Sequence, residues 1–161
     1  MEILWQELIS GFADGKELAR AVIRLIAAVL LGAVIGYERE KAGKAAGLRT
    51  HMLVTLGTCL FVLASAQAGM NSDGLSRVIQ GIVTGIGFIG AGSILKLNEE
   101  RDIRGLTTSA GIWMAAAIGV TVGLGAIGLA LLATFVTLIV LAAVKPVDLV
   151  PDETGKKEND A

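Results

Sequence analysis

The side chains best suited to chemistry lie in two short polar segments of a chain that is otherwise strongly apolar. Residues 38–51 carry carboxylate, guanidinium, hydroxyl and imidazole groups, and residues 104–108 carry a guanidinium and hydroxyl groups. A carboxylate such as Glu38 held against an arginine would satisfy both charges beside a region of low dielectric constant. The alternative is two loops of solvated charges. The expected polar cluster comprises Glu38, Arg39, Arg49, Thr50, His51, Arg104, Thr107 and Thr108.

A second polar group, Asp73, Arg77 and Gln80, stands at the start of another apolar stretch. These side chains could form a cluster at the opposite membrane surface, because they combine an acid, a base and an amide. An ordinary helix start, capped by Ser72 or Asp73, is the alternative. Arg24 lies about a turn and a half inside the first apolar stretch, where its long stem could carry the guanidinium to the outer interface.

Arrangements typical of enzymes are absent from the sequence. Cys59 is the single cysteine and His51 the single histidine, so neither a cysteine pair nor a multi-histidine metal site can form; sensing of protons near neutral pH remains open to His51. Every Asp and Glu lies at or outside the ends of the apolar stretches, whereas a path for divalent ions needs acidic oxygen ligands within them. We therefore predict no enzyme, no cofactor and no resident metal.

Five long apolar stretches must position these groups. Each is close to the roughly 20 residues that a helix needs to cross about 30 Å of hydrocarbon. The composition agrees, with 53% hydrophobic and 18% charged residues and a mean hydropathy of +0.69. We predict an all-α integral membrane protein, a bundle of about five transmembrane helices. The stretches are 18–36, 50–69, 78–97, 107–123 and 124–144.

These stretches divide the chain into three parts. Residues 1–17 form an amphipathic or flexible N-terminal segment, with apolar residues near helical spacing. Residues 18–144 form the transmembrane domain. Residues 145–161 are polar and lack apolar periodicity, so a disordered cytoplasmic tail is expected.

The basic residues predict the topology. Lysines and arginines gather after the first and third apolar stretches, so both of these loops should be cytoplasmic. The N-terminus is then outside and the C-terminus cytoplasmic, although Lys16, Arg20 and Arg24 oppose this assignment. A net charge of −1 argues against nucleic acid as a partner, because neutralising phosphates requires a basic face.

Small residues recur four apart on single helix faces, a pattern that lets helix backbones touch within a bilayer. Residues 85–92 also match the dinucleotide pattern GxGxxG, but they lie inside a membrane span rather than between a strand and a helix. The helix could break locally at these residues if neighbouring protein enclosed the freed backbone groups. The predicted packing positions are Gly32, Gly36, Gly81, Gly85, Gly87, Gly90, Gly92, Gly111, Ala115, Gly119 and Gly123.

Four blocks in order, residues 32–40, 46–54, 85–92 and 104–113, resemble the MgtC/SapB family of bacterial membrane proteins. The resemblance implies a multi-pass protein of the inner membrane, in a family linked to growth at low magnesium. Its members look more like modulators of other membrane proteins than carriers. Many also have a soluble C-terminal domain, which we expect this chain to lack.

Two functions follow. The leading hypothesis is a noncatalytic regulator, associated as a homodimer through its small-residue faces and presenting its polar loops to another membrane protein. The alternative is a small transporter or channel for Mg²⁺, H⁺ or K⁺, with a broken helix at residues 85–92. Its route would be lined by Glu38, Arg49, Asp73 or Gln80.

Overall fold

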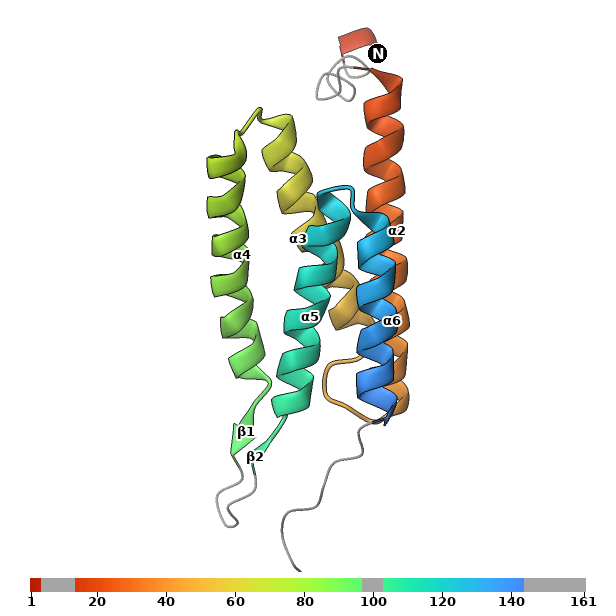
Figure 1. Ribbon diagram of the computed structural model, residues 1–161, viewed down its shortest axis with the longest axis vertical. Coiled ribbons are helices and arrows are strands. Elements are labelled where there is room, and N and C mark those ends of the chain that lie inside the picture. The colour runs from red at the N-terminus through yellow and green to blue at the C-terminus, as the bar shows by residue number, and fades with distance from the viewer. Residues whose placement is uncertain (4–13, 97–102, 144–161) are drawn as a thin grey trace, which may run out of the picture.

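The computed structural model describes residues 1–3, 14–96 and 103–143. Most of the predicted N-terminal segment and the whole predicted tail lie outside these residues. The described chain is built almost wholly from helices, and two short strands pair between α4 and α5 (Figure 1). The helices are α2 (Gly15–Lys41), α3 (Leu48–Gln67), α4 (Ser72–Gly92), α5 (Leu106–Gly123) and α6 (Ile127–Ala143).

Four of these helices, α2 to α5, are long and apolar enough to cross a membrane, and α6 is a shorter apolar helix of 17 residues. The expected all-α membrane fold is confirmed. The third predicted stretch, 78–97, is misplaced at both ends, because α4 covers residues 72–92. Its polar first turn is stabilised by a cap rather than by hydrophobicity: Asn71 Oδ1 accepts a hydrogen bond of 3.0 Å from Gly74 N. The cap is therefore Asn71, not Ser72 or Asp73.

The helices alternate in direction. The α2–α3 loop, the α4–α5 connection and the C-terminal end of α6 lie at one end of the bundle, and the α3–α4 and α5–α6 turns face the other way (Figure 1). In the α4–α5 connection, strands β1 (Leu95–Lys96) and β2 (Ile103–Arg104) pair antiparallel. Gly105 follows with φ of +96°, and a Cβ there would lie 3.2 Å from Ile94 Cα. Glycine suits that position because L side chains rarely adopt this conformation.

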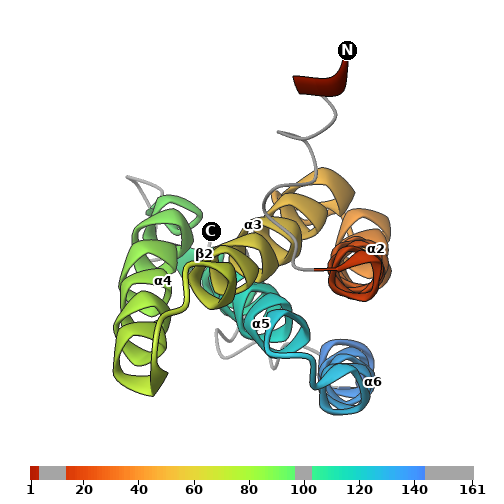
Figure 2. The same ribbon diagram turned by 90° about the horizontal axis from the view of Figure 1, so that it is seen from above.

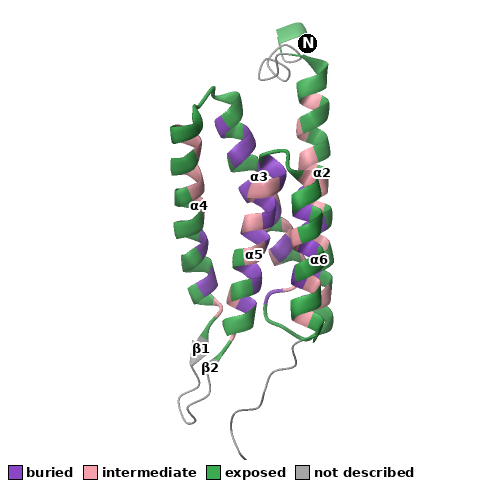
Figure 3. Ribbon diagram, viewed as in Figure 1, coloured by how far each residue is buried: buried purple, intermediate pink, exposed green. Residues whose placement is uncertain are grey.

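Helix α5 is the centre of the bundle, because it packs against α2, α3, α4 and α6. Seen from above, α4 stands on the far side of α5 from α6 (Figure 2). Buried residues concentrate on α3 and α5, while most of α4 is exposed (Figure 3). The main buried cluster lies where α2, α3 and α5 meet, with Ala130 of α6 at its edge. A smaller cluster packs Ile86 of α4 against Ile112 and Ala116 of α5.

Glycines set the distance between these three helices. A Cβ on Gly36 of α2 would lie 2.7 Å from Leu48 Cα at the start of α3, and one on Gly123 of α5 would lie 2.7 Å from Val62 Cβ. A Cβ on Gly119 would overlap Thr58 Oγ1. Because a real Cβ needs more room, the backbones can approach this closely only through glycine.

We expect Gly119→Ala to lower the free energy of unfolding by about 1–3 kcal/mol, because overpacking must push α3 away from α5. This cost should exceed the small gain in helix propensity from alanine. The measurement is reversible unfolding in mixed micelles. Gly128→Ala is the matched control, since nothing lies within 4 Å of a Cβ there, and equal effects of the two changes would contradict the packing argument.

Candidate functional site: a buried polar junction

His51 is the most deeply buried polar side chain at the end of the bundle that carries the charged loops. It lies in the first turn of α3, is 0% exposed, and its Nδ1 is 2.9 Å from Gly47 O. A carbonyl can only accept, so Nδ1 carries a proton and donates. Nε2 is buried and has no hydrogen-bond partner among the described residues. A Cβ on Gly111 of α5 would lie 3.4 Å from Nε2, so the imidazole ring extends from α3 to α5.

Arg39 is the second buried group, at the end of α2. Its side chain is 4% exposed and that of Glu38 is 26% exposed. Arg39 Nη2 donates to Glu38 Oε1 at 2.6 Å, and Nε donates to Oε2. This two-point contact satisfies a guanidinium that would otherwise be buried without a counter-charge.

Glu40, near the end of α2, contacts the start of α3. The residue that precedes α3, Gly47, has no side chain to cap the helix. Glu40 Oε2 accepts a hydrogen bond of 2.9 Å from Leu48 N instead. A carboxylate at a helix N-terminus also interacts favourably with the helix dipole. Sequence reasoning did not assign this role, which depends on the path of the connecting loop.

The predicted polar cluster is only partly drawn together. Arg39, His51 and Thr108 are buried, and Glu38 and Thr50 are half-buried. Among them, Glu38 and Arg39 are joined by a side-chain contact. Arg49, Thr107 and Arg104 are exposed. The junction, made of Glu38, Arg39, Glu40 and His51, thus combines a buried imidazole and a buried guanidinium with a half-buried carboxylate, and exposed Arg49 and Arg104 lie at the same end of the bundle.

The predicted outer group lies along one side of α4 without side-chain contacts between its members. Asp73, Arg77 and Gln80 are all exposed on the first turns of α4. Within the part of the chain that the structure describes, no hydrogen bond or ion pair joins their side chains. They lie at the end of the bundle opposite to the junction (Figure 1).

The hydroxyl groups along α3 do not form a hydrogen-bonded chain that leads from the junction into the membrane. Thr55 Oγ1 donates to His51 O at 3.0 Å, and Thr58 Oγ1 donates to Val54 O at 2.9 Å. Ser65 Oγ donates to Phe61 O at 2.7 Å. Each hydroxyl therefore bonds a carbonyl of its own helix, which is how Ser and Thr are usually accommodated in apolar helices.

Arg24 has a structural partner that the sequence did not indicate. Its Nη1 donates to Gly123 O at 2.9 Å, at the C-terminal end of α5. A cation is favourable there, because the final carbonyls of a helix carry partial negative charge. The contact links α2 to the α5–α6 turn.

Most glycines of helix α4 have open space beside them. The exceptions are Gly90, where a Cβ would lie 2.6 Å from Ser109 Oγ of α5, and Gly74 in the first turn, where it would lie 3.2 Å from Met70 Cβ. No atom lies within 4 Å of a Cβ on Gly81, Gly85, Gly87 or Gly92. The helix is also continuous through residues 85–92, so the local break considered from the sequence is not present.

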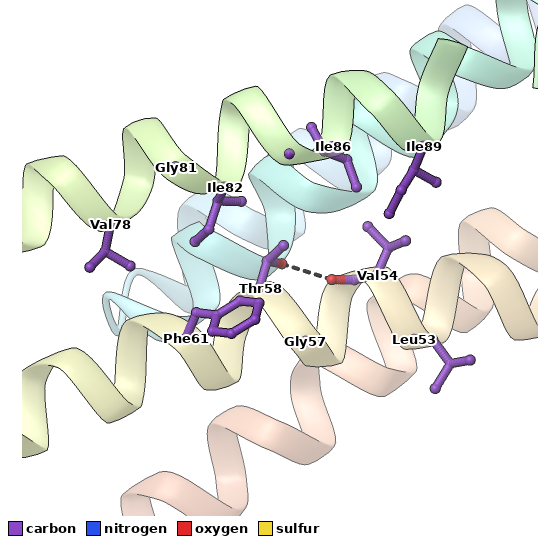
Figure 4. Close-up of a pocket in the computed structure, with 11 residues that line it drawn as sticks. Leu53, Val54, Gly57, Thr58, Phe61, Val78, Gly81, Ile82, Ile86 and Ile89 are labelled. Carbon is purple, nitrogen blue, oxygen red and sulfur yellow. Dashed lines mark hydrogen bonds between the residues drawn. The ribbon is translucent and has the colours of Figure 1, made fainter. Parts of the chain in front are cut away.

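An apolar groove of about 580 Å³ separates α4 from α3. Figure 4 shows Phe61 of α3 opposite Ile82 of α4, with the Thr58 hydroxyl bonded back to Val54. Gly81 and Gly85 also line this groove. The rest of the lining includes Leu53, Val78, Ile86 and Ile89.

Metal ligands do not converge in the described chain. Among residues 1–3, 14–96 and 103–143, no group of three or more His, Cys, Asp and Glu side chains is placed to hold an ion. The contacts of the junction are instead hydrogen bonds and one ion pair. Fold and site together define a multi-pass helical membrane protein with a buried polar junction at one end.

Comparison with known proteins places it in a family. Residues 25–149 match the MgtC family, and the chain belongs to that family. SrpB of Synechococcus elongatus is 44% identical over 133 residues, which cover 76% of this chain and 73% of SrpB. Protein MgtC of Salmonella typhimurium is 46% identical over 117 residues, 73% of this chain and 49% of that protein.

A third relative is YhiD of Escherichia coli K12, whose name proposes that it transports magnesium. It is 45% identical over 130 residues, which cover 76% of this chain and 60% of YhiD. The chain thus spans about half the length of the Salmonella relative and somewhat more of YhiD. No solved structure matches the chain.

We expect Glu38→Gln to lower the free energy of unfolding by about 1–2 kcal/mol, because it removes the charge that faces buried Arg39. Thermal unfolding in detergent would measure the effect. Lys41→Gln, at the exposed end of the same helix, is the control and should change stability by no more than about 0.5 kcal/mol. A Glu38 variant as stable as the control would show that the pair contributes nothing.

Proposed function

We propose that this MgtC-family protein is a noncatalytic regulator in the bacterial inner membrane, which adjusts other membrane proteins during magnesium limitation or related stress. The observation that carries the proposal is that both carboxylates of the junction already accept hydrogen bonds from the chain itself. Glu38 is committed to Arg39, and Glu40 to the start of α3. Neither offers the open set of oxygen ligands that Mg²⁺ requires. Family membership and the name of YhiD support the link to magnesium.

We propose an orientation with the junction facing the cytoplasm. The two charged connections share one end of the bundle with the C-terminal end of α6 (Figure 1). An excess of Lys and Arg favours the cytoplasmic side. The N-terminus of α2 is then outside. Arg24 is compatible with this topology, because its guanidinium interacts with the C-terminus of α5.

The proposed assembly is a homodimer through α4. Gly32 and Gly36 of α2 and the glycines of α5 have close neighbours inside the bundle. Nothing lies within 4 Å of a Cβ on Gly81 or Gly85, which line the groove beside α3. Small residues four apart are the usual contact surface between transmembrane helices. A second copy could pack its own α4 against the stripe formed by Gly81 and Gly85. Both copies carry the same face, so a two-fold symmetric contact would give a closed dimer.

We expect Gly81→Leu with Gly85→Leu to weaken dimerisation about tenfold or more, because two side chains would separate the helix backbones. Sedimentation equilibrium in detergent would give the dissociation constant. Gly87→Leu is the matched control, since it lies on another face of α4 and is equally open. Unchanged dimerisation in the double variant, or a wild-type monomer, would refute the proposed interface.

A small ion transporter or channel is the second candidate. The unpaired Nε2 of His51 and the name of YhiD favour it. Arg49 and Asp73, however, lie at opposite ends of the bundle. The hydroxyls of α3 between them are bonded to their own helix. A route would therefore need a rearrangement of α3 or α4.

The two candidates differ in ion flux. We expect purified protein in sealed proteoliposomes to show no flux of Mg²⁺, H⁺ or K⁺ above that of empty liposomes, because no continuous polar route crosses the described helices. A Glu38→Gln, Asp73→Asn variant is the control for any signal. Flux that this variant abolishes would establish transport. If folded protein shows no ion flux, the next experiment is crosslinking from residues of the junction to capture a partner protein.

A further inference from the structure

We propose that the end of the bundle opposite to the junction binds the headgroup of an anionic phospholipid, through Arg24 and Arg20 with help from Lys16. This inference is independent of the regulatory proposal and of the direction of insertion. It starts from Arg24, an arginine in a helix long and apolar enough to cross the membrane. Such a residue is costly in hydrocarbon and usually marks a function or a route to the interface.

The position of the Arg24 guanidinium is well determined by its neighbours. Nη1 donates to Gly123 O at 2.9 Å. Gly125, in the turn that follows, has φ of +86°, and a Cβ there would lie 3.0 Å from Arg24 Cζ. The missing side chain of Gly125 therefore leaves room for the guanidinium to lie over the turn. No salt bridge to Arg24 is present among the described residues.

One hydrogen bond uses only a part of what arginine can donate. A guanidinium has five N–H groups in a planar fork that matches two oxygens of a phosphate. Arg24 is half-buried, so part of its surface is accessible. The negative end of α5 offsets some of its charge, but a carbonyl is no full counter-ion.

The helices at this end of the bundle have unequal lengths. At 1.5 Å per residue, α2 is about 40 Å long, whereas α5 and α6 are about 27 Å and 26 Å long. The hydrocarbon core is about 30 Å thick. Figure 1 shows the α5–α6 turn ending well below the N-terminal end of α2. A short pair of helices thins the bilayer locally, which brings headgroups down onto the turn and beside the protruding end of α2.

The N-terminal end of α2, which extends past the α5–α6 turn (Figure 1), carries further positive charge. Lys16 and Arg20 are exposed and lie eight and four residues before Arg24, so the three side chains follow one broad helix face. Glu17 lies on the same face and reduces the sum, but the group remains net positive. Basic residues near a membrane surface attract anionic lipids with about 1 kcal/mol each, or about fivefold in affinity. The chemistry that fits is a lipid phosphodiester.

The test uses the full chain in detergent, with thermal unfolding and native mass spectrometry read out after addition of phosphatidylglycerol or phosphatidylcholine of equal chain length. We expect phosphatidylglycerol to raise the unfolding temperature more and to be retained preferentially. Arg20→Gln should weaken that preference about fivefold, and Lys16→Gln with Arg20→Gln further still. These exposed positions avoid the loss of the α2–α5 contact that Arg24→Gln would cause.

Arg49→Gln is the matched control, because Arg49 is an exposed arginine at the opposite end of the bundle. It should keep the full preference for phosphatidylglycerol. A separate arm adds inorganic phosphate alone, which we expect not to raise the unfolding temperature, since the bilayer or micelle must hold the headgroup beside the basic side chains. The proposal is overturned if Lys16 and Arg20 variants retain the preference, if Arg49→Gln abolishes it, or if phosphate alone reproduces it.

Discussion

The close approach of helix backbones is the constraint on which the rest of this structure depends. Between lipid tails there is little hydrophobic force to hold apolar helices together, so dispersion contacts at short range must do it. Gly32, Gly36, Gly119 and Gly123 allow α2, α3 and α5 to approach until backbone atoms almost touch. The small core, made of residues such as Ala28, Ala115 and Cys59, follows from that short separation.

The polar junction is a consequence of the same approach. Because α2 and α3 meet tightly at Gly36, the last turn of α2 lies against the first turn of α3. Arg39 and His51 are then buried together, and their hydrogen bonds must come from nearby backbone and from Glu38. The junction is therefore built from local partners at a helix crossing, in contrast to the open ligand sets that bind dehydrated ions.

Helix α4 and the protruding end of α2 are the parts that this packing leaves unused. A glycine stripe without neighbours, an apolar groove and a basic helix face all lie outside the three-helix centre. Exposed features of this kind are where a membrane protein meets other molecules, because the core already satisfies its own contacts. The regulatory, dimeric and lipid-binding proposals each depend on one of these surfaces or on the junction.

The sequence by itself determined the class of the fold, the approximate places of the apolar helices α2 to α6, and the family, since long apolar stretches and ordered motifs are local properties of the chain. It also placed Glu38, Arg39 and His51 near one membrane surface. Only the tertiary structure decided which glycines are packed, that Asn71 caps α4, that Glu40 caps α3, and that Arg24 reaches Gly123. The physical reason is that residue spacing gives the face of a helix, while helix crossing and loop path decide what that face meets.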